Sequence, residues 1–387
     1  MKKIILYYGP KSGFEMLIPK SKKTLSELVT EHDAKNKIFT HRIKKEDDDA
    51  TQELEIPSKE YIEKEYIENL IAYSESYSGI TESAIQSFVS LISSYDIDNF
   101  YLQNPPMQIK QQLEQAFPNM LSVKKYNYKK FNESMFFKIN DTFGDNIIGQ
   151  ENVKKRLLIS LYPLMEHNSN RKPVVIMFYG NSGIGKTETA KFISKILGQP
   201  LFRKQFSMFH SGEFQSYLFG GNHFQACFAR DLLERESNVI LLDEFDKPHP
   251  VFHSAFYQLF DEGIFEDKNY NVELYNSIII CTSNYQSEAE IRKHLGDPIF
   301  FRFDKFIKFE DLSEDSLKRI IEMLIDKKYK SLSKVEKKNV DRDYIKAQLF
   351  KNVSKLTNVR QISTIVDEYF SLQLVEKMLA QHSKQNK

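Results

Sequence analysis

A glycine-rich stretch with one lysine and one threonine is the part of the sequence best suited to chemistry. The segment "YGNSGIGKTETAKFI", residues 179–193, fits the spacing Gly180-x4-Gly185-Lys186-Thr187 of a phosphate-binding P-loop. Glycines let backbone N–H groups close around phosphates, and the positive end of the following helix adds to the attraction. The residues expected to hold the nucleotide here are Gly180, Asn181, Ser182, Gly183, Ile184, Gly185, Lys186, Thr187 and Glu188.

Two of these residues have individual roles in such a site. Lys186 is expected to reach the β- and γ-phosphates, and the Thr187 hydroxyl is expected to coordinate Mg²⁺. The alternative is an ordinary glycine-rich turn between a strand and a helix. The apolar run before the motif and the helix-like stretch after it are the context that a P-loop needs, so the sequence favours a nucleotide site.

An acidic pair follows the apolar run "NVILL" at residues 238–242. Asp243 and Glu244 therefore fall at the carboxyl end of a predicted strand, where open α/β sheets bind their ligands. On its own such a pair is usually part of a solvated loop. Downstream of a P-loop it predicts a metal ligand, Asp243, and a general base for the attacking water, Glu244.

Polar and basic residues farther along the chain could complete this site. The apolar run "NSIIICTSNY" ends in Thr282, Ser283 and Asn284, and a polar side chain there is placed to orient the attacking water. Arg302 and Arg360 are two candidates for stabilising charge on a transferring phosphoryl group, often from a neighbouring subunit. For either arginine taken alone, a surface salt bridge is the simpler interpretation.

The bulk composition limits the classes of protein to consider. The chain has 387 residues, 54 basic and 53 acidic, and its net charge of +1 gives no general attraction to nucleic acid or an anionic membrane. Two cysteines suit a reducing cytoplasm and need no disulfide framework. The first apolar run ends at Tyr8, which is too short for a signal peptide and predicts a buried strand. No window approaches the length of a membrane-spanning helix.

Changes in composition and in hydrophobic pattern along the chain predict four parts. Residues 1–125 suggest a small α/β or α+β domain, and residues 126–145 suggest a linker. In residues 146–310, runs of Val, Ile and Leu alternate with amphipathic stretches, the pattern of a parallel sheet with helices on both faces. Residues 311–387 have a helical pattern, which predicts a small helical domain.

Local patterns in the first part predict particular elements. Residues 81–95 predict one helix with Thr81 as its N-cap, and residues 105–117 predict a second helix that starts with prolines. Short apolar runs at Ile4–Tyr8 and Phe100–Leu102 could be strands. The charge run "KKEDDDATQELE" is most simply a solvated loop.

Taken together, the motifs resemble the AAA+ superfamily. More narrowly, they resemble the Clp unfoldase and disaggregase group, in particular the second ATPase module of its two-ring members. The likeness runs from about residue 146 to the C-terminal helices. "NIIGQENVKKRL" resembles the segment that contacts adenine, which places Ile147 and Ile148 against the base, and "VILLDEFDKPHPVFHSAFYQLFDEGIFED" resembles the Walker B strand and the helix after it.

The resemblance also implies roles for the polar and basic residues. "IIICTSN" resembles sensor 1, with Asn284 as the sensing residue, and "FFRFDKFIKF" makes Arg302 the finger offered to the next subunit. "NVRQI" resembles sensor 2, which gives Arg360 a role on the γ-phosphate of its own subunit. The resemblance implies an ATPase that uses ATP and Mg²⁺ and assembles as a homo-oligomer, a hexameric ring.

The chain also departs from the Clp pattern. Clp ATPases carry a pore loop with a Gly-aromatic-Val-Gly signature that grips translocating polypeptide. The corresponding stretch, "YLFGGNHFQACFARDLLERESNVILLDE", is shorter and lacks that signature, leaving Phe224 as the only aromatic at about the right place. There is no Ile-Gly-Phe or Ile-Gly-Leu tripeptide for docking a partner protease, and there is one ATPase module. Residues 1–125 resemble no family.

Two functions fit these observations. One is ATP-driven remodelling of a protein partner that the N-terminal domain selects. The other is an ATPase switch or assembly scaffold, whose nucleotide state controls oligomerisation or an effector without threading a chain, a role that a bacterial defence system could use. Nucleic-acid remodelling gains little from the charge balance. His210, His223 and Cys227 fit no standard metal-ligand spacing, and Cys281 is expected in a core.

Overall fold

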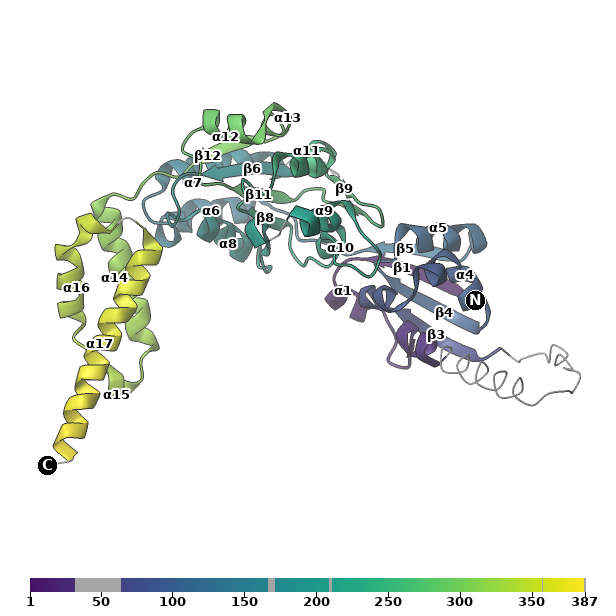
Figure 1. The fold of residues 1–387 in the computed structure, drawn as a ribbon, viewed down its shortest axis with the longest axis horizontal. Coiled ribbons are helices and arrows are strands. Elements are labelled where there is room, and N and C mark those ends of the chain that lie inside the picture. Colours follow the sequence, from purple (N-terminus) through teal and green to yellow (C-terminus); the bar gives the residue numbers. More distant parts are fainter. Residues whose placement is uncertain (32–63, 166–170, 209–210, 357, 386–387) are drawn as a thin grey trace, which may run out of the picture. The chain divides into compact units, whose positions relative to one another are not determined.

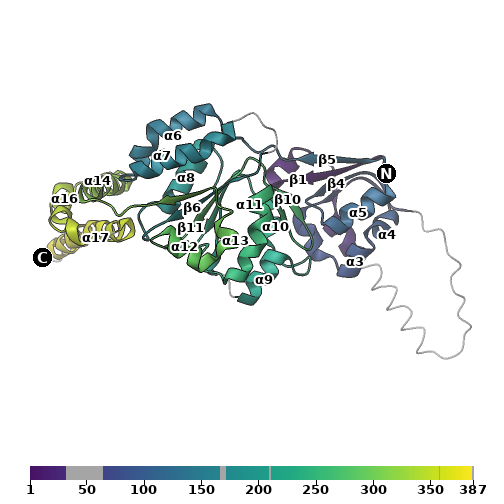
Figure 2. The ribbon, with the colours of Figure 1, turned by 90° about the horizontal axis from the view of Figure 1, so that it is seen from above.

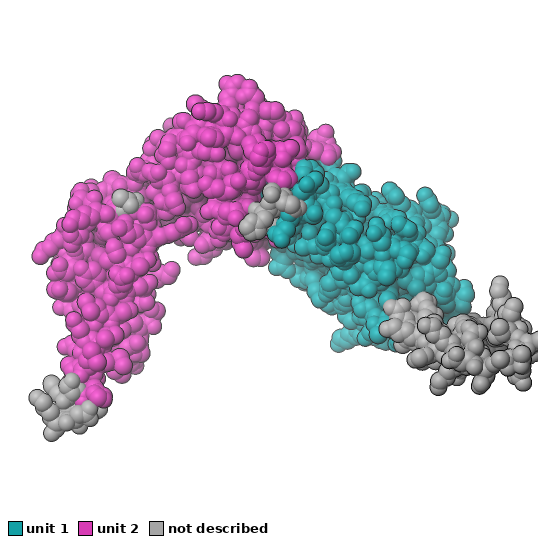
Figure 3. All heavy atoms as spheres, viewed as in Figure 1, with its two compact units in different colours: residues 1–128, 210–236, 264–273 teal, residues 129–209, 237–263, 274–387 magenta. Residues whose placement is uncertain are grey.

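The described residues of this computed structural model fall into two compact units. The structure describes residues 1–31, 64–165, 171–208, 211–356 and 358–385, so the charge run at 44–55 and His210 lie outside the described residues. Unit 1 comprises 1–128, 210–236 and 264–273, and unit 2 comprises 129–209, 237–263 and 274–387 (Figure 3).

Unit 2 is built around a five-stranded parallel sheet with the order β12-β6-β11-β8-β7 (Figure 1). Every residue of the three central strands is buried, as expected for runs of Val, Ile and Leu in a sheet covered on both faces. The strands are β6 (Val174–Tyr179), β7 (Phe202–Gln205), β8 (Val239–Asp243), β11 (Ile278–Thr282) and β12 (Lys305–Lys308).

Helices cover both faces of this sheet. Figure 2 shows α6, α7 and α8 on one side of it and α12 and α13 on the other. Alternate strand residues such as Ile176, Leu241 and Ile280 pack into one core with the first three helices. On the other face the rings of Phe245, Phe256 and Phe260 pack against one another in edge-on and tilted arrangements. The elements are α6 (Glu133–Asn146), α7 (Glu151–Leu161), η2 (Tyr162–Met165), α8 (Lys186–Leu197), η3 (Phe206–Met208), η4 (Pro250–Phe256), α11 (Tyr257–Glu262), α12 (Glu288–Leu295) and α13 (Asp297–Phe300).

Most of the segment that the sequence predicts as a linker is helix α6. Asn132 caps it, because its side-chain oxygen accepts a hydrogen bond from the Met135 N–H group. Met135, Ile139 and Phe143 recur every four residues and are buried in the core of unit 2. Most of the residues predicted as a linker at 126–145 thus form a core helix here, and the boundaries of that linker stay a prediction.

The C-terminal part of unit 2 is helical, in agreement with the pattern of the sequence. Its own core contains Ile321, Ile345, Ile362 and Phe370, which are almost fully buried, together with Ile148. Ser313 caps the first of these helices by accepting from the Ser316 N–H group. The helices are α14 (Glu314–Ser331), α15 (Lys334–Lys337), α16 (Arg342–Lys351), η5 (Val353–Lys355) and α17 (Val359–Gln385).

Unit 1 contains a second five-stranded parallel sheet, with the order β2-β3-β4-β1-β5. The predicted strands at Ile4–Tyr8 and Phe100–Leu102 are confirmed, and both lie in the middle of this sheet. The strands are β1 (Lys3–Tyr8), β2 (Lys23–Thr24), β3 (Tyr66–Ala72), β4 (Asp96–Gln103) and β5 (Leu121–Lys125).

The helices of unit 1 lie on both faces of its sheet. Ile85, Phe88 and Ile109 pack against one face, and Phe14 packs with Tyr7 on the other. The single helix predicted for 81–95 is two short helices, because Ser87 leaves the helical conformation (φ −114°, ψ 33°), whereas the N-cap at Thr81 is confirmed. The helices are α1 (Lys11–Glu15), η1 (Ser74–Gly79), α3 (Glu82–Gln86), α4 (Phe88–Ser93) and α5 (Met107–Ala116).

Two segments from the second half of the chain also belong to unit 1. They contain α9 (Ser211–Phe219), α10 (Phe228–Leu233), and the antiparallel pair β9 (Ile264–Glu266) and β10 (Asn271–Glu273). The fold is thus α/β with two parallel sheets and a set of C-terminal helices. The division of the chain at residues 146 and 311 remains a prediction. Among the helices that the structure describes, none has the length and apolar content that a membrane crossing requires.

The burial of α6 predicts its weight in the stability of unit 2. Ile139→Ala removes a fully buried side chain and should lower the free energy of unfolding by about 2–5 kcal/mol. Phe137→Ala is the matched control in the same helix, because Phe137 is half exposed, and should change it by less than about 0.5 kcal/mol. Urea unfolding followed by circular dichroism measures both. Equal effects of the two substitutions would contradict the assignment of α6 to the core.

Candidate nucleotide-binding site

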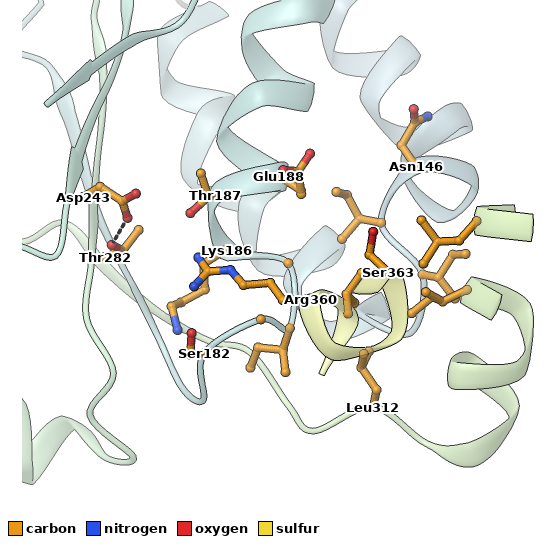
Figure 4. Close-up of a pocket in the computed structure, with 18 of the residues that line it drawn as sticks. Asn146, Ser182, Lys186, Thr187, Glu188, Asp243, Thr282, Leu312, Arg360 and Ser363 are labelled. Carbon is orange, nitrogen blue, oxygen red and sulfur yellow. Dashed lines mark hydrogen bonds between the residues drawn. The ribbon is translucent and has the colours of Figure 1, made fainter. Parts of the chain in front are cut away.

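A cavity of about 530 Å³ lies at the carboxyl end of the unit 2 sheet, beside the turn between β6 and α8. Its volume falls in the range of small-molecule sites, and parallel sheets bind ligands at this edge. Figure 4 shows side chains from the P-loop, from β8 and from α17 around one space. Of the residues predicted from the sequence, those that line it are Ile147, Ile148, Ser182, Gly183, Ile184, Gly185, Lys186, Thr187, Glu188, Asp243, Glu244, Asn284 and Arg360.

Glycine is required at two positions of the P-loop by space and by backbone conformation. Gly180 has φ +125°, and a Cβ there would lie 2.5 Å from the backbone oxygen of Phe309. Gly183 has φ +78°, and a Cβ there would lie 2.8 Å from the Cβ of Asn358. The Val359 N–H group donates to the Gly183 carbonyl at 3.0 Å, so the loop is tied directly to the start of α17.

Lys186 is buried beneath the loop with its ammonium group surrounded by oxygen acceptors. Its Nζ atom donates to the carbonyls of Gly180 and Asn181, at 2.6 and 2.7 Å, and to Oδ1 of Asn284 at 3.2 Å. Burial lowers the pKa of Lys186 from 10.5 to about 8, and Asp243 acts in the opposite direction. A lysine held in this way has a cation ready for the phosphates of a nucleotide.

Asp243 ends strand β8 with both carboxylate oxygens engaged. Thr282, on the neighbouring strand β11, donates its hydroxyl to Oδ1 at 2.5 Å. Arg203, on β7, donates through Nε and Nη2 to Oδ2 at 3.0 and 2.6 Å. The Thr187 hydroxyl lines the same cavity, so the two oxygen-bearing side chains expected for Mg²⁺ are both present.

Glu244 follows in an unusual backbone conformation. Its φ of 57° is rare for a residue with a side chain, and such strain is typical of functional sites. The Glu244 N–H group donates to the Thr282 hydroxyl at 2.9 Å, and its carboxylate accepts from Nε2 of Gln205 at 3.2 Å. Glu244 therefore lines the cavity in an orientation that two neighbouring strands fix.

The end of the cavity where the nucleotide base is expected is apolar. Ile147 and Ile148 are buried there, and residues of the C-terminal helices, among them Ile320, Leu324 and Val359, line it with them. A flat heteroaromatic ring fits such a surface, whereas the P-loop end presents a cation and backbone amides. The two ends together suit a purine nucleotide.

The two arginines occupy different places. Arg360, in the first turn of α17, extends toward Lys186 (Figure 4) and is close enough to contribute to lowering the pKa of that lysine. Arg302 does not line the cavity: its Nε atom donates to Asp261 at 2.8 Å, and its guanidinium lies over the ring of Tyr257. Whether Arg302 acts on a neighbouring subunit stays a prediction.

Gly180 and Asn181 of the predicted P-loop set support the loop from outside the cavity. The Asn181 amide donates to Asp311 at 2.6 Å, and its oxygen accepts from Gln286. Gln150, nearly fully buried, donates to the carbonyls of Ile184 and Glu310 and so joins the P-loop to the chain after β12.

Sequence reasoning missed Gln150, Arg203 and Gln205. Gln150 lies inside the quoted segment "NIIGQENVKKRL", directly after the two isoleucines, so its position was the available signal. Arg203 and Gln205 alternate on a four-residue strand, which places both on one face, but so short a polar run carries no signal of its own.

The other sequence-level predictions concern cysteine and histidine. Cys281 is fully buried in β11, as expected, and Cys227 is a second buried, free thiol. Within the described ranges no group of three or more His, Cys, Asp or Glu side chains could hold a metal ion. Of the three residues considered as metal ligands from the sequence, His210 lies outside those ranges.

Comparison with known proteins agrees with this geometry. Residues 171–346 match a family model described as "AAA domain (Cdc48 subfamily)". This part of the chain is an AAA domain. Curated relatives include the Chaperone protein ClpB of Malacoplasma penetrans (29% identical over 181 residues, 41% of this chain and 26% of the relative), the Mitochondrial disaggregase of Homo sapiens (29% over 276 residues, 66% and 37%) and the AAA+ ATPase ClpV1 of Pseudomonas aeruginosa (27% over 269 residues, 60% and 29%).

These relatives identify the ATPase module as Clp-type AAA+. The similarity spans only about a quarter to two-fifths of the length of the relatives. The family match does not include the sheet of residues 1–125, which remains unassigned. The AAA domain implies a nucleotide site that binds ATP, and the cavity at the P-loop is where the structure provides one.

The lowered pKa of Lys186 predicts proton uptake when nucleotide binds. At pH 8.5 most of the ligand-free protein holds a neutral Lys186, because its pKa is about 8. Phosphate charges favour the ammonium form, so ATP binding at this pH should take up a fraction of a proton. At pH 6.5 Lys186 is charged in both states and contributes none.

Titration calorimetry in two buffers with different ionisation enthalpies measures this uptake. Lys186→Arg is the control, since arginine keeps its charge at both pH values. Equal uptake by the parent and by this variant at pH 8.5 would assign the proton to another group.

Proposed function

We propose that the chain is an ATP-hydrolysing AAA+ ATPase that couples hydrolysis to conformational work on a protein partner. The observation that carries this proposal is the convergence of Lys186, Asp243, Glu244, Asn284 and Arg360 on one cavity. These groups come from the start of α8, the end of β8, the loop after β11 and the first turn of α17. Together they match the requirements of phosphoryl transfer to water.

Each group has a task that its position supports. The P-loop amides and Lys186 hold the β- and γ-phosphates, and Arg360 reaches into the same space from α17 and extends toward Lys186. The Glu244 carboxylate takes a proton from the attacking water, and Asn284 orients that water. Bound Mg²⁺, held through Thr187 and Asp243, would neutralise charge that develops on the phosphate oxygens.

The proposal includes assembly into a ring of identical subunits. Arg302 lies outside its own cavity, which suits a residue that reaches a neighbouring nucleotide. The relatives named as chaperone and disaggregase support a protein as the partner, and the balanced charge gives nucleic acid no advantage. A cytoplasmic location remains a prediction, consistent with two free cysteines.

A second candidate is an ATPase switch or scaffold that controls an effector without threading a chain. One observation favours it: the segment 210–236, which contains Phe224 and occupies the pore-loop position in chain order, belongs to unit 1 with the N-terminal sheet. A pore loop must protrude and move freely to hold a polypeptide. A segment that belongs to unit 1 is better suited to transmitting a conformational change to that unit.

The position of Glu244 predicts how hydrolysis depends on it. Glu244→Gln keeps the shape of the side chain but cannot accept the proton of water, so turnover should fall by roughly two or more orders of magnitude. Binding of Mg·ATP should be retained, because Lys186 and the P-loop are unchanged. Phosphate release and fluorescent-nucleotide binding measure the two effects. Near-normal turnover in this variant would rule out Glu244 as the base.

The position of Arg302 predicts that activity depends on assembly. Specific activity should rise with protein concentration, and Arg302→Ala should lower turnover with little change in ATP affinity. Mixing Arg302→Ala with Glu244→Gln should restore part of the activity, because some interfaces then pair an intact Glu244 with an intact Arg302. A stable monomer with concentration-independent turnover would defeat this part of the proposal.

A further inference from the structure

The segment between β7 and β8 is held inside unit 1 at several points. Residues 210–236 run through α9 and α10 and lead into β8, the strand that ends at Asp243. In the Clp pattern this stretch carries the pore loop. Here its C-terminal end contacts the N-terminal part of the chain, and its central loop contacts both that part and the β9–β10 hairpin.

The first contact is a set of hydrogen bonds that residues of the N-terminal sheet donate to the carboxylate of Glu234. Its Oε1 atom accepts hydrogen bonds from Nε2 of Gln103 at 3.0 Å and from Nδ2 of Asn104 at 2.9 Å. Its Oε2 atom accepts from the backbone N–H group of Lys11 at 3.2 Å. Gln103 and Asn104 are fully buried at the carboxyl end of β4, and Gly9 lies at the corresponding end of β1.

Gln103 and Asn104 are also held by hydrogen bonds that do not involve Glu234. Asn104 accepts from the Gly9 N–H group at 2.9 Å, and both amide side chains donate to the Gly9 carbonyl. Asn104 has φ +46°, a conformation that aims its side chain at this point at some cost. Burial raises the pKa of Glu234, and hydrogen bonding to Ser74, Asn104 and Lys11 opposes this effect without cancelling it. The donors of the site therefore offset part of the desolvation of the carboxylate.

The second contact holds the loop around Phe224. His223 is buried, and its Nε2 atom lies 2.6 Å from the Ile80 carbonyl in the N-terminal part of the chain. Arg230 donates to the hydroxyl of Ser78 at 2.9 Å. Phe224 itself is 55% exposed, but its neighbour on the loop is fixed.

The third contact comes from the hairpin at 264–273. The Lys268 N–H group donates to the Phe219 carbonyl at 3.2 Å, and the Asn269 amide donates to the Gly221 carbonyl at 3.1 Å. The Met107 N–H group, at the start of α5, donates to the Asn269 carbonyl at 2.8 Å. The loop that precedes Phe224 is thus fixed by the hairpin, and the hairpin is fixed by the N-terminal domain.

We propose that Glu234 is the positioning residue through which the segment 210–236 moves the N-terminal sheet, so that this sheet, rather than a pore loop, is the output of the ATPase. The proposal deepens the proposed function and rests on it. The chain continues from Glu234 into β8 within a few residues; β8 ends at Asp243, and Glu244 follows directly. A change in the position of that strand between nucleotide states is transmitted along the backbone to the anchored carboxylate.

The chemistry of the anchor makes a sharp substitution possible. Gln103, Asn104 and the Lys11 backbone all donate to the Glu234 carboxylate, so Glu234→Gln keeps the size of the side chain but turns an N–H group toward these donors. The matched control is Glu236→Gln. Glu236 is exposed and accepts one hydrogen bond, from the Ser12 hydroxyl at 2.5 Å. The glutamine of Glu236→Gln can keep this bond through its amide oxygen.

The experiment is hydrogen–deuterium exchange on the full chain, with and without Mg·ATP, in the Glu244→Gln background that binds without turnover. In the ligand-free state, Glu234→Gln should raise exchange of the peptide containing Lys11 about tenfold or more, because a bond to a charged acceptor is lost. Glu236→Gln should leave it unchanged. With the anchor intact, ATP should slow exchange in 180–188 and should also change exchange in 9–14 and 101–106.

Loss of the response in 9–14 and 101–106 in Glu234→Gln, with the response in 180–188 kept, supports the proposal. Persistence of the distant response in that variant, its absence in the parent, or free exchange of 220–227 in every state would overturn it. If Glu234→Gln does not fold, Asn104→Gly removes a donor from the other side and is compatible with the positive φ. No slowing in 180–188 would overturn the proposed function itself, while ligand-free exchange at Lys11 would still report on the anchor.

Discussion

The hydroxyl of Thr282 joins two neighbouring strands at the point where the chemistry is expected. It donates to Asp243 at 2.5 Å and accepts from the backbone of Glu244 at 2.9 Å, so one atom sets the position of both acidic residues. The parallel register of β11 with β8 brings Thr282 to this place. The positive φ of Glu244 and the contacts of Arg203 and Gln205 depend on that same alignment, because β7 pairs in turn with β8.

The P-loop depends on close packing as much as on hydrogen bonds. Gly180 approaches the Phe309 backbone and Gly183 approaches Asn358, so the loop is shaped by the segments after β12 and before α17. Gln150 adds a third support by bonding to the Ile184 carbonyl. The nucleotide cavity is therefore closed by the C-terminal helices as well as by the sheet, and a shift of α17 would alter the loop and Arg360 together.

Much of unit 2 could be predicted from the sequence, because its signals are local. The buried runs at β6, β8 and β11 and the glycine spacing each predict their own element, and the parallel sheet then brings the ends together. α6 was missed as a helix because its aromatic and polar residues suggest a connector when the four-residue recurrence of Met135, Ile139 and Phe143 is not considered. Arg203 and Gln205 could not be predicted, since their roles arise only from the pairing of β7 with β8.

Unit 1 was harder to predict for a different reason: it is assembled from parts of the chain that are far apart. By Lys125 synthesis has made all five strands of its sheet, but the carboxylate that enters the Gln103–Asn104 site and the hairpin that pairs with Lys125 through Glu273 are made only later. Much of the ATPase core must therefore be synthesised before the buried amides of Gln103 and Asn104 can bind the carboxylate of Glu234. Contacts between residues so far apart in sequence slow folding. Residues 1–125 expressed alone would also lack the segments that complete unit 1.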